Sequence, residues 1–134
     1  MESNNPERRA GRLPEEFRGR TKRFASSVIH LYVRLPKARE EVRTLGKQLL
    51  RSGTSVAAHV REASRGRSEA EFIAKLGGAL QEADESQLWL ELLREECAIG
   101  APETQPLETE ASELIAIMTT MITRTEQRMN PGAR

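Results

Sequence analysis

The chain has few aromatic side chains, which make up 4% of its 134 residues. Leu, Ile, Val, Ala and Met must therefore supply most of the core, and such a core suits a helical bundle better than a β-sandwich. The single cysteine, Cys97, has no partner for a disulfide within the chain. We expect it to be a buried thiol rather than a reactive one, in a reducing compartment.

Long apolar runs are also missing. No stretch of about eighteen apolar residues occurs, so the sequence predicts no transmembrane helix and no membrane partner. The N-terminus lacks the apolar core of a signal peptide. We therefore expect a cytoplasmic protein, and the length predicts one domain.

The usual signatures of catalysis and metal binding are missing as well. The sequence has no phosphate loop, no strained nucleophile turn and no cluster of oxyanion donors. The two histidines, His30 and His59, fall in different predicted helices and lack the Glu-x-x-His spacing of di-iron bundles. We expect no enzyme activity, no cofactor and no metal.

Charge is unevenly distributed, although the formal net charge is only +1. Residues 1–67 hold 16 Lys and Arg against 7 Asp and Glu, whereas residues 68–134 hold 5 against 13. Either the two halves are charge partners within the fold, or the basic half offers a face to nucleic acid or to an acidic protein.

Hydrophobic periodicity predicts four helices, at about residues 21–34, 37–63, 68–99 and 107–128. Short connections between long helices make neighbours antiparallel, so we predict an all-α, up-down four-helix bundle. The bundle would cover residues 21–128. Residues 1–20 are predicted to be a disordered basic arm, and residues 129–134 a flexible tail.

Particular residues predict where the later helices begin and end. Ser68 is a good N-cap, and Glu71 three residues later completes a capping box. Gly100 is interpreted as the C-cap of the third helix. Pro102 and Pro106 are interpreted as helix breakers, which would place them in a loop before the fourth helix.

The third predicted helix has two unusual features. Gly77 and Gly78 cost about 1 kcal/mol each relative to Ala, so they indicate either a closely approaching backbone or a weak point. Leu88, Trp89 and Leu92 extend the apolar surface around most of the circumference, as in a helix buried on two sides. The second side would be covered by another subunit or, alternatively, by the first helix lying over Trp89.

Basic residues spaced by four form a ladder along the second predicted helix, and further arginines extend the charge to its far end. These candidates for nucleic-acid binding are Arg39, Arg43, Lys47, Arg51, Arg61, Arg65 and Arg67. Such arrays bind phosphate backbones with strong salt dependence, although the aromatic residues of single-strand readers are missing. The alternative is a solvated or intersubunit salt-bridging face.

Polar residues occupy positions of the second and third predicted helices that should be apolar. They are Ser52, Ser55, His59, Glu62, Glu82, Glu85 and Ser86. We interpret them as a structural polar layer that fixes helix register. The alternative is a small hydrolytic site that uses His59 with Glu85.

Four segments, RTKRFASSVIHLYVRLPK, QLLRSGTSVAAHVREA, RSEAEFIAKLGGALQEADESQLWLELL and LETEASELIAIM, cover nearly all of residues 21–118. Together they resemble the four-helix-bundle proteins encoded in intervening sequences of bacterial 23S ribosomal RNA genes. Relatives of that family include the accessory protein of diversity-generating retroelements. The family-like positions are Leu35, Pro36, Gln48, Leu49, Arg51, Ser52, Ser55, Glu62, Ser68, Phe72, Glu82, Glu85, Trp89 and Leu90. The chain departs from the family at His59, where Asn is common, and at Ala63, where Gly is frequent.

The resemblance implies a bundle that assembles into a ring, typically a homopentamer, with no known enzymatic activity. For the retroelement relative it implies binding to a reverse transcriptase and to nucleic acid through a basic surface. We therefore expect a bacterial, non-catalytic, homo-oligomeric scaffold that binds RNA, DNA or a nucleic-acid enzyme such as a reverse transcriptase. The alternative is a purely structural homo-oligomeric assembly protein with no nucleic-acid partner.

Overall fold

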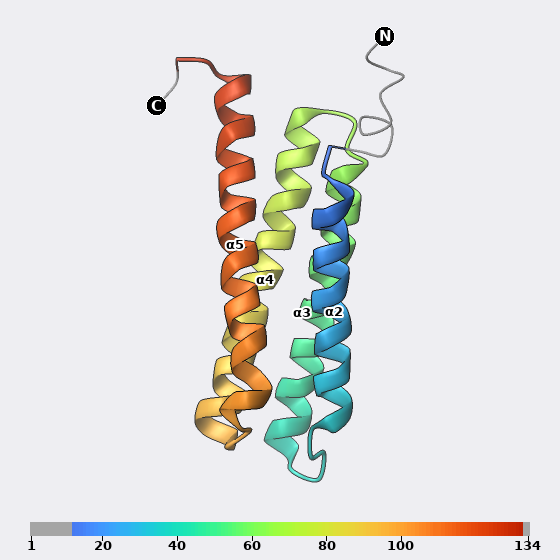
Figure 1. The fold of residues 1–134 in the computed structure, drawn as a ribbon, viewed down its shortest axis with the longest axis vertical. Helices are drawn as coiled ribbons and strands as arrows, with labels where there is room; N and C mark the ends of the chain where they lie inside the picture. The colour runs from blue at the N-terminus through green and yellow to red at the C-terminus, as the bar shows by residue number, and fades with distance from the viewer. Residues whose placement is uncertain (1–11, 133–134) are drawn as a thin grey trace.

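The computed structural model describes residues 12–132, and within that range it contains four α-helices and no strand. The helices are α2 (Glu15–Arg34), α3 (Glu40–Ser64), α4 (Glu69–Cys97) and α5 (Ala101–Met129). Successive helices run antiparallel and side by side (Figure 1). Each helix contacts the next, α2 contacts α5 least, and α2 does not contact α4. The predicted all-α, up-down arrangement of four helices is confirmed.

The first helix begins at Glu15 rather than near residue 21, so residues 15–20 of the predicted arm are helical. Pro14 is the N-cap, and Glu15 and Glu16 favour a helix N-terminus through the helix dipole. Leu13 and Phe17 are buried and anchor this end of α2 to the core. Residues 1–11 of the predicted arm lie outside the described residues.

The prediction that Pro102 and Pro106 lie in a loop is wrong, because α5 begins at Ala101 and contains both. A proline in the first turn of a helix needs no partner for the N–H that it lacks, so Pro102 is compatible with the helix start. Gly100 is the N-cap of α5 rather than the C-cap of α4. The C-cap is Ala98, which has a left-handed conformation with φ of 60°.

The start of α4 agrees with the predicted capping box. The Ser68 hydroxyl accepts a hydrogen bond from the Glu71 backbone N–H at 3.0 Å. The Glu71 carboxylate in turn accepts from the backbone N–H of Arg67 at 2.7 Å, one residue earlier than in the standard box. This reciprocal pair fixes the turn between α3 and α4.

Two glycines of α3, seven residues apart, face α2 at short distance. A Cβ added at Gly53 would lie 2.8 Å from a methyl carbon of Val28, and one at Gly46 would lie 2.8 Å from Leu35 Cδ1. The side chains of α2 therefore pack directly on the α3 backbone. This close packing fixes how α2 lies on α3, and so where the cations of α2 stand relative to those of α3.

Candidate nucleic-acid interface

The first two cations of the predicted ladder are engaged within the fold. Arg39 donates to the carbonyl oxygen of Cys97, the last residue of α4, at 2.8 Å. Arg43 donates to the carbonyl oxygen of Lys37 at 2.7 Å and also pairs with Glu40. A cation at a helix C-terminus is favourable because the last carbonyl groups carry partial negative charge. Arg39 and Arg43 therefore hold the lower end of the bundle together.

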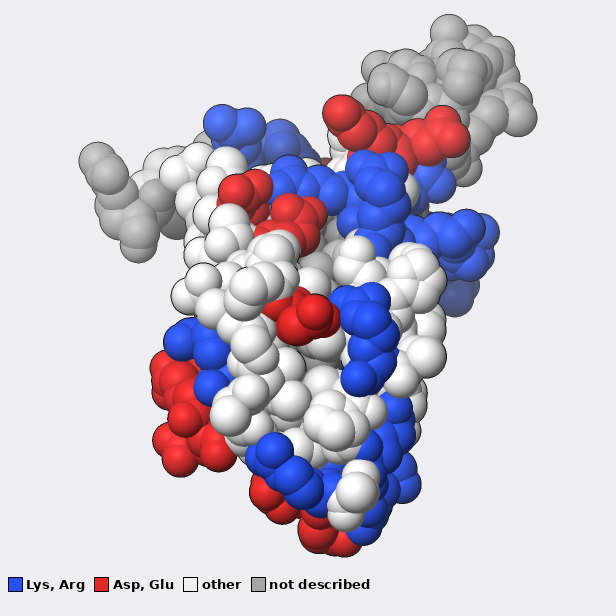
Figure 2. Space-filling model, turned by 60° about the horizontal axis from the view of Figure 1, so that its bottom comes forward, with Lys and Arg blue, Asp and Glu red and all other residues white. Residues whose placement is uncertain are grey.

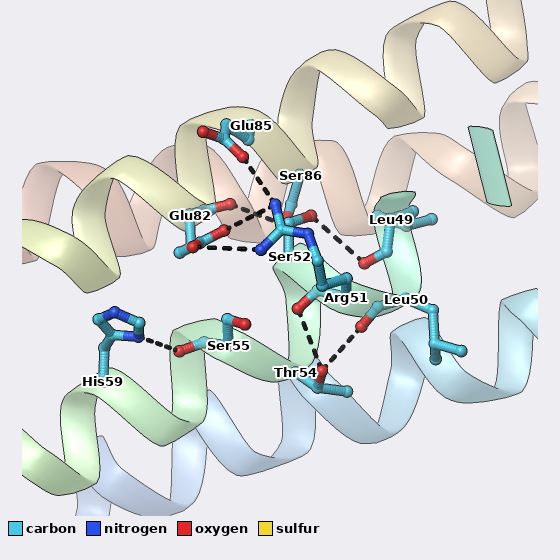
Figure 3. Close-up of polar contacts among 10 residues, drawn as sticks. All are labelled: Leu49, Leu50, Arg51, Ser52, Thr54, Ser55, His59, Glu82, Glu85 and Ser86. Carbon is cyan, nitrogen blue, oxygen red and sulfur yellow. Dashed lines mark hydrogen bonds and ion pairs between the residues drawn. The ribbon is translucent and has the colours of Figure 1, made fainter. Parts of the chain in front are cut away.

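Arg51 is engaged as well, whereas Lys47 is not. The Arg51 guanidinium reaches from α3 to α4, where it lies 3.1 Å from Glu85 Oε1 and 3.4 Å from Glu82 Oε2 (Figure 3). Lys47 is exposed and forms no ion pair with any described residue. Three of the four ladder cations thus have internal partners, which weakens the ladder as a contact surface for phosphates.

The remaining candidates lie at the far end of α3 and in the turn to α4, where they help to line a pocket of about 620 Å³. The α2 and α4 helices, which do not contact each other, form its two walls, and α3 forms the floor between them. The cations that line the pocket are Arg18, Lys22, Arg61, Arg65, Arg67 and Lys75. Arg18, Lys22 and Lys75 were not among the predicted candidates, although Arg18 and Lys22 show the same spacing by four as the ladder.

Among the described residues, Lys75 is the one cation of this set that pairs with an acidic side chain of the pocket. Glu62 and Glu71 are the two carboxylates of the lining. Glu62 pairs with Lys75 at 3.3 Å, and Glu71 is engaged in capping α4. Within the described part of the chain, the other five cations form no ion pair, and the Nε atom of Arg18 is buried without a hydrogen-bond partner. Lys and Arg gather on the α2–α3 side of the molecule (Figure 2).

Elsewhere the basic and acidic halves of the chain are partners within the fold. Arg20 of α2 makes a bidentate pair with Glu110 of α5, with distances of 2.7 and 2.9 Å. A second bidentate pair lies within the acidic half, where Arg94 of α4 donates to Glu108 of α5 at 2.9 and 3.0 Å. The hydrogen bonds from Arg94 hold the pKa of Glu108 below its usual range, against the opposing effect of burial. The uneven charge of the sequence is thus compensated along α5 but not in the pocket.

The Glu108 pair predicts a dependence of stability on pH. Because the folded-state pKa is lowered, its contribution is complete above the unfolded-state pKa and is lost as the pH falls through the folded value. We expect Glu108→Gln to lower the free energy of unfolding by less than about 1 kcal/mol at neutral pH. The variant should also lose less stability than the parent between about pH 5 and pH 3 in urea titrations. Equal acid sensitivity of the two proteins would contradict this prediction.

The residues of the predicted polar layer are divided among separate contacts. The hydroxyls of Ser52 and Ser86 lie 2.8 Å apart, and both side chains are buried. The Nδ1 atom of His59 lies 3.0 Å from the carbonyl oxygen of Ser55 on its own helix (Figure 3). Glu85 turns to Arg51, so the structure forms no hydrogen bond between His59 and Glu85.

The side chains of the other members of that layer make separate contacts, although the carbonyl oxygen of Glu82 accepts from the Ser86 hydroxyl at 2.9 Å. Glu82 and Glu85 both pair with Arg51, and Ser55 is half-buried. Glu62 is exposed and belongs to the basic pocket. Only the Ser52–Ser86 contact therefore has the internally satisfied geometry that a register-fixing pair requires.

The predicted oligomer interface on α4 has one clearly exposed apolar residue. Leu88 is 46% exposed, whereas Trp89 and Leu92 are half-buried. Trp89 packs against the core, and its indole Nε1 is buried without a hydrogen-bond partner. Cover from α2, the alternative considered from the sequence, does not occur because α2 and α4 lie on opposite corners of the bundle.

Two further features are absent from residues 12–132. No helix in this range has an apolar stretch long enough to cross a membrane. The same range contains no group of three or more His, Cys, Asp or Glu side chains arranged to hold a metal ion.

The four antiparallel helices of the described residues place this protein among the small all-α bundle proteins. The chain belongs to the 23S rRNA-intervening sequence protein family, which matches residues 16–120. A crystal structure from Bacteroides thetaiotaomicron, described as a protein with unknown function from the S23 ribosomal protein family, is 34% identical with a TM-score of 0.73. The match covers 79% of this chain and 94% of that one. A comparison with curated proteins gives no match. The family resemblance in the sequence is thus confirmed.

Proposed function

We propose that this protein is a non-catalytic scaffold that assembles with copies of itself and binds nucleic acid through phosphate contacts. The observation that carries the proposal is the set of five cations around one pocket that form no ion pair with any described residue, whereas most other basic residues in 12–132 are paired. Positive side chains without internal partners are available to replace the counterions of a phosphate backbone.

Self-assembly would support this function, because an assembly carries several copies of a pocket that has only a few cations in each chain. One pocket per chain would repeat around a homo-oligomer, for which the family resemblance implies a five-membered ring. Linked sites bind a long polymer more tightly than single ones, since the second contact is intramolecular. A formal net charge of only +1 per chain is therefore compatible with binding a polyanion. A reverse transcriptase or another nucleic-acid enzyme would be a further partner of the same scaffold.

Binding should be independent of base sequence and sensitive to salt, because the contacts are to phosphates. We expect the intact protein to retain labelled single-stranded RNA and DNA at low salt. Raising the salt from about 50 to 200 mM should weaken binding by at least about tenfold. Fluorescence anisotropy measures this directly, with light scattering on the same sample to record assembly. If an intact assembly bound neither polymer at low salt, the purely structural alternative would replace this proposal.

A further inference from the structure

The pocket over α3 has a shape as well as a charge. Its floor contains Ala57, Ala58 and Val60, whose side chains are small or apolar, and its volume is about 620 Å³. Pockets of about 300–1,000 Å³ hold ligands of the size of a nucleotide. A flat basic surface would bind a phosphate backbone from outside, but a hollow of this size has room for a sugar and a base beside the phosphates.

The cations reach the hollow from three sides. Arg18 and Lys22 come from α2, one turn apart, and Arg61 and Arg65 come from α3 with the same spacing. Arg67 comes from the turn that the capping box of α4 holds in place. Guanidinium groups donate in a fork that matches the oxygens of a phosphate, and several of them in one site suit more than one phosphate.

Arg18 contributes a further observation, because its Nε atom is buried without a hydrogen-bond partner among the described residues. A buried donor without an acceptor is costly, and most buried polar groups in proteins have a hydrogen-bond partner. Arg18 lines this pocket, where a phosphate oxygen is an acceptor of the right charge. The two carboxylates of the lining are engaged with Lys75 and with the α4 N-terminus.

Resting on the proposed function, we infer that this pocket is the phosphate-binding site and that it takes a nucleotide unit of a single strand. The phosphates lie among the cations of α2 and α3, and the sugar and base lie over the alanine floor. A duplex is too wide to enter a hollow of this volume and reaches only the rim. Single strands are therefore bound in preference to duplexes.

The charge test uses two double variants that change the net charge equally. Lys22→Glu with Arg61→Glu removes two unpaired cations of the pocket. Arg23→Glu with Lys47→Glu removes two exposed and unpaired cations outside it. The probe is a fluorescein-labelled dT12 strand, measured by anisotropy with the full chain. The pocket variant should bind at least about tenfold more weakly, with a salt slope lower by about two, whereas the control should change about twofold or less.

The shape test changes no charge. Ala58→Leu fills the floor of the pocket, and Ala116→Leu makes the same change at an exposed position of α5. We expect about fivefold or greater weakening for Ala58→Leu and none for Ala116→Leu. Circular dichroism checks that all four variants keep their helices.

The outcomes separate this inference from the proposed function. If the parent did not bind dT12 or an RNA of equal length, the proposed function would fail. If the parent bound but both double variants lost affinity equally, the function would stand and the pocket assignment would fall. Competition with AMP, inorganic phosphate and a blunt 12-base-pair duplex tests the ligand class. Displacement of dT12 by micromolar AMP or phosphate, or equal affinity for the duplex, would overturn the single-strand assignment.

Discussion

Replacing Gly53 by leucine is expected to lower the free energy of unfolding by about 3 kcal/mol, the upper part of the usual range for overpacked cores. A Cβ at this position would lie 2.8 and 2.9 Å from the two methyl carbons of Val28 and 3.1 Å from its Cβ. Val28 is fully buried and β-branched, so it has little freedom to turn away. The larger side chain would force α2 away from α3. Urea unfolding measures the loss.

Two variants serve as controls for this prediction. Gly77→Ala places a Cβ where no other atom lies within 4 Å, so it should raise the free energy of unfolding by about 1 kcal/mol through helix propensity alone. Combining Gly53→Ala with Val28→Ala should destabilise less than the sum of the single changes, because the methyl groups that clash are gone. Additive losses would mean that Gly53 is not needed for the close approach of α2 and α3.

Gly78, which follows Gly77 in α4, has a close neighbour that the sequence alone could not identify. The Gly77–Gly78 pair predicted either a closely approaching backbone or a weak point in the helix. At Gly78 the close neighbour is the imidazole ring of His59, whose Cδ2 would lie 2.5 Å from an added Cβ. At Gly77 nothing lies close. A run of glycine shows that space is needed, but only the packed structure shows which side chain uses it.

The helices themselves could be predicted because their signals are local. The spacing of apolar residues and the Ser68–Glu71 pair depend on neighbours within a few turns. The predicted start of the last helix, near residue 107, is wrong because α5 begins at Ala101. The sequence predicts Pro102 and Pro106 as helix breakers, but Pro102 lies in the first turn of α5, where a proline is compatible with a helix, and Pro106 lies further inside the helix.

The candidate site depended on contacts that no local pattern contains. Arg39 and Arg51 belong to a regular ladder in the sequence, but both reach partners on α4. Cys97, which accepts from Arg39, is 58 residues further along the chain, and Glu82, which accepts from Arg51, is 31 residues further along. The pocket combines cations of α2, α3 and α4 that become neighbours only when the bundle closes. Charge counts along the chain showed that the first half is basic. They did not show which cations remain without partners.

The assembly is expected to depend on the α4 face around Leu88. This side chain is 46% exposed, and Leu92, one turn further on, is half-buried beside it. Trp89 contributes less directly, because it already packs against the core of its own chain. A second copy that covered Leu88 would remove its apolar surface from water, which is the main favourable term in most protein association.

Leu88→Glu should therefore reduce the mass in solution from several chains to the monomer mass of 15.0 kDa. Helicity should be retained, because the substituted side chain points to solvent in the single chain. Light scattering at micromolar concentration, together with circular dichroism, measures both. Val33→Glu is the matched control, since Val33 is 68% exposed on α2 and lies away from the α4 face. A monomeric parent would exclude the assembly, and dissociation by Val33→Glu alone would move the interface to α2.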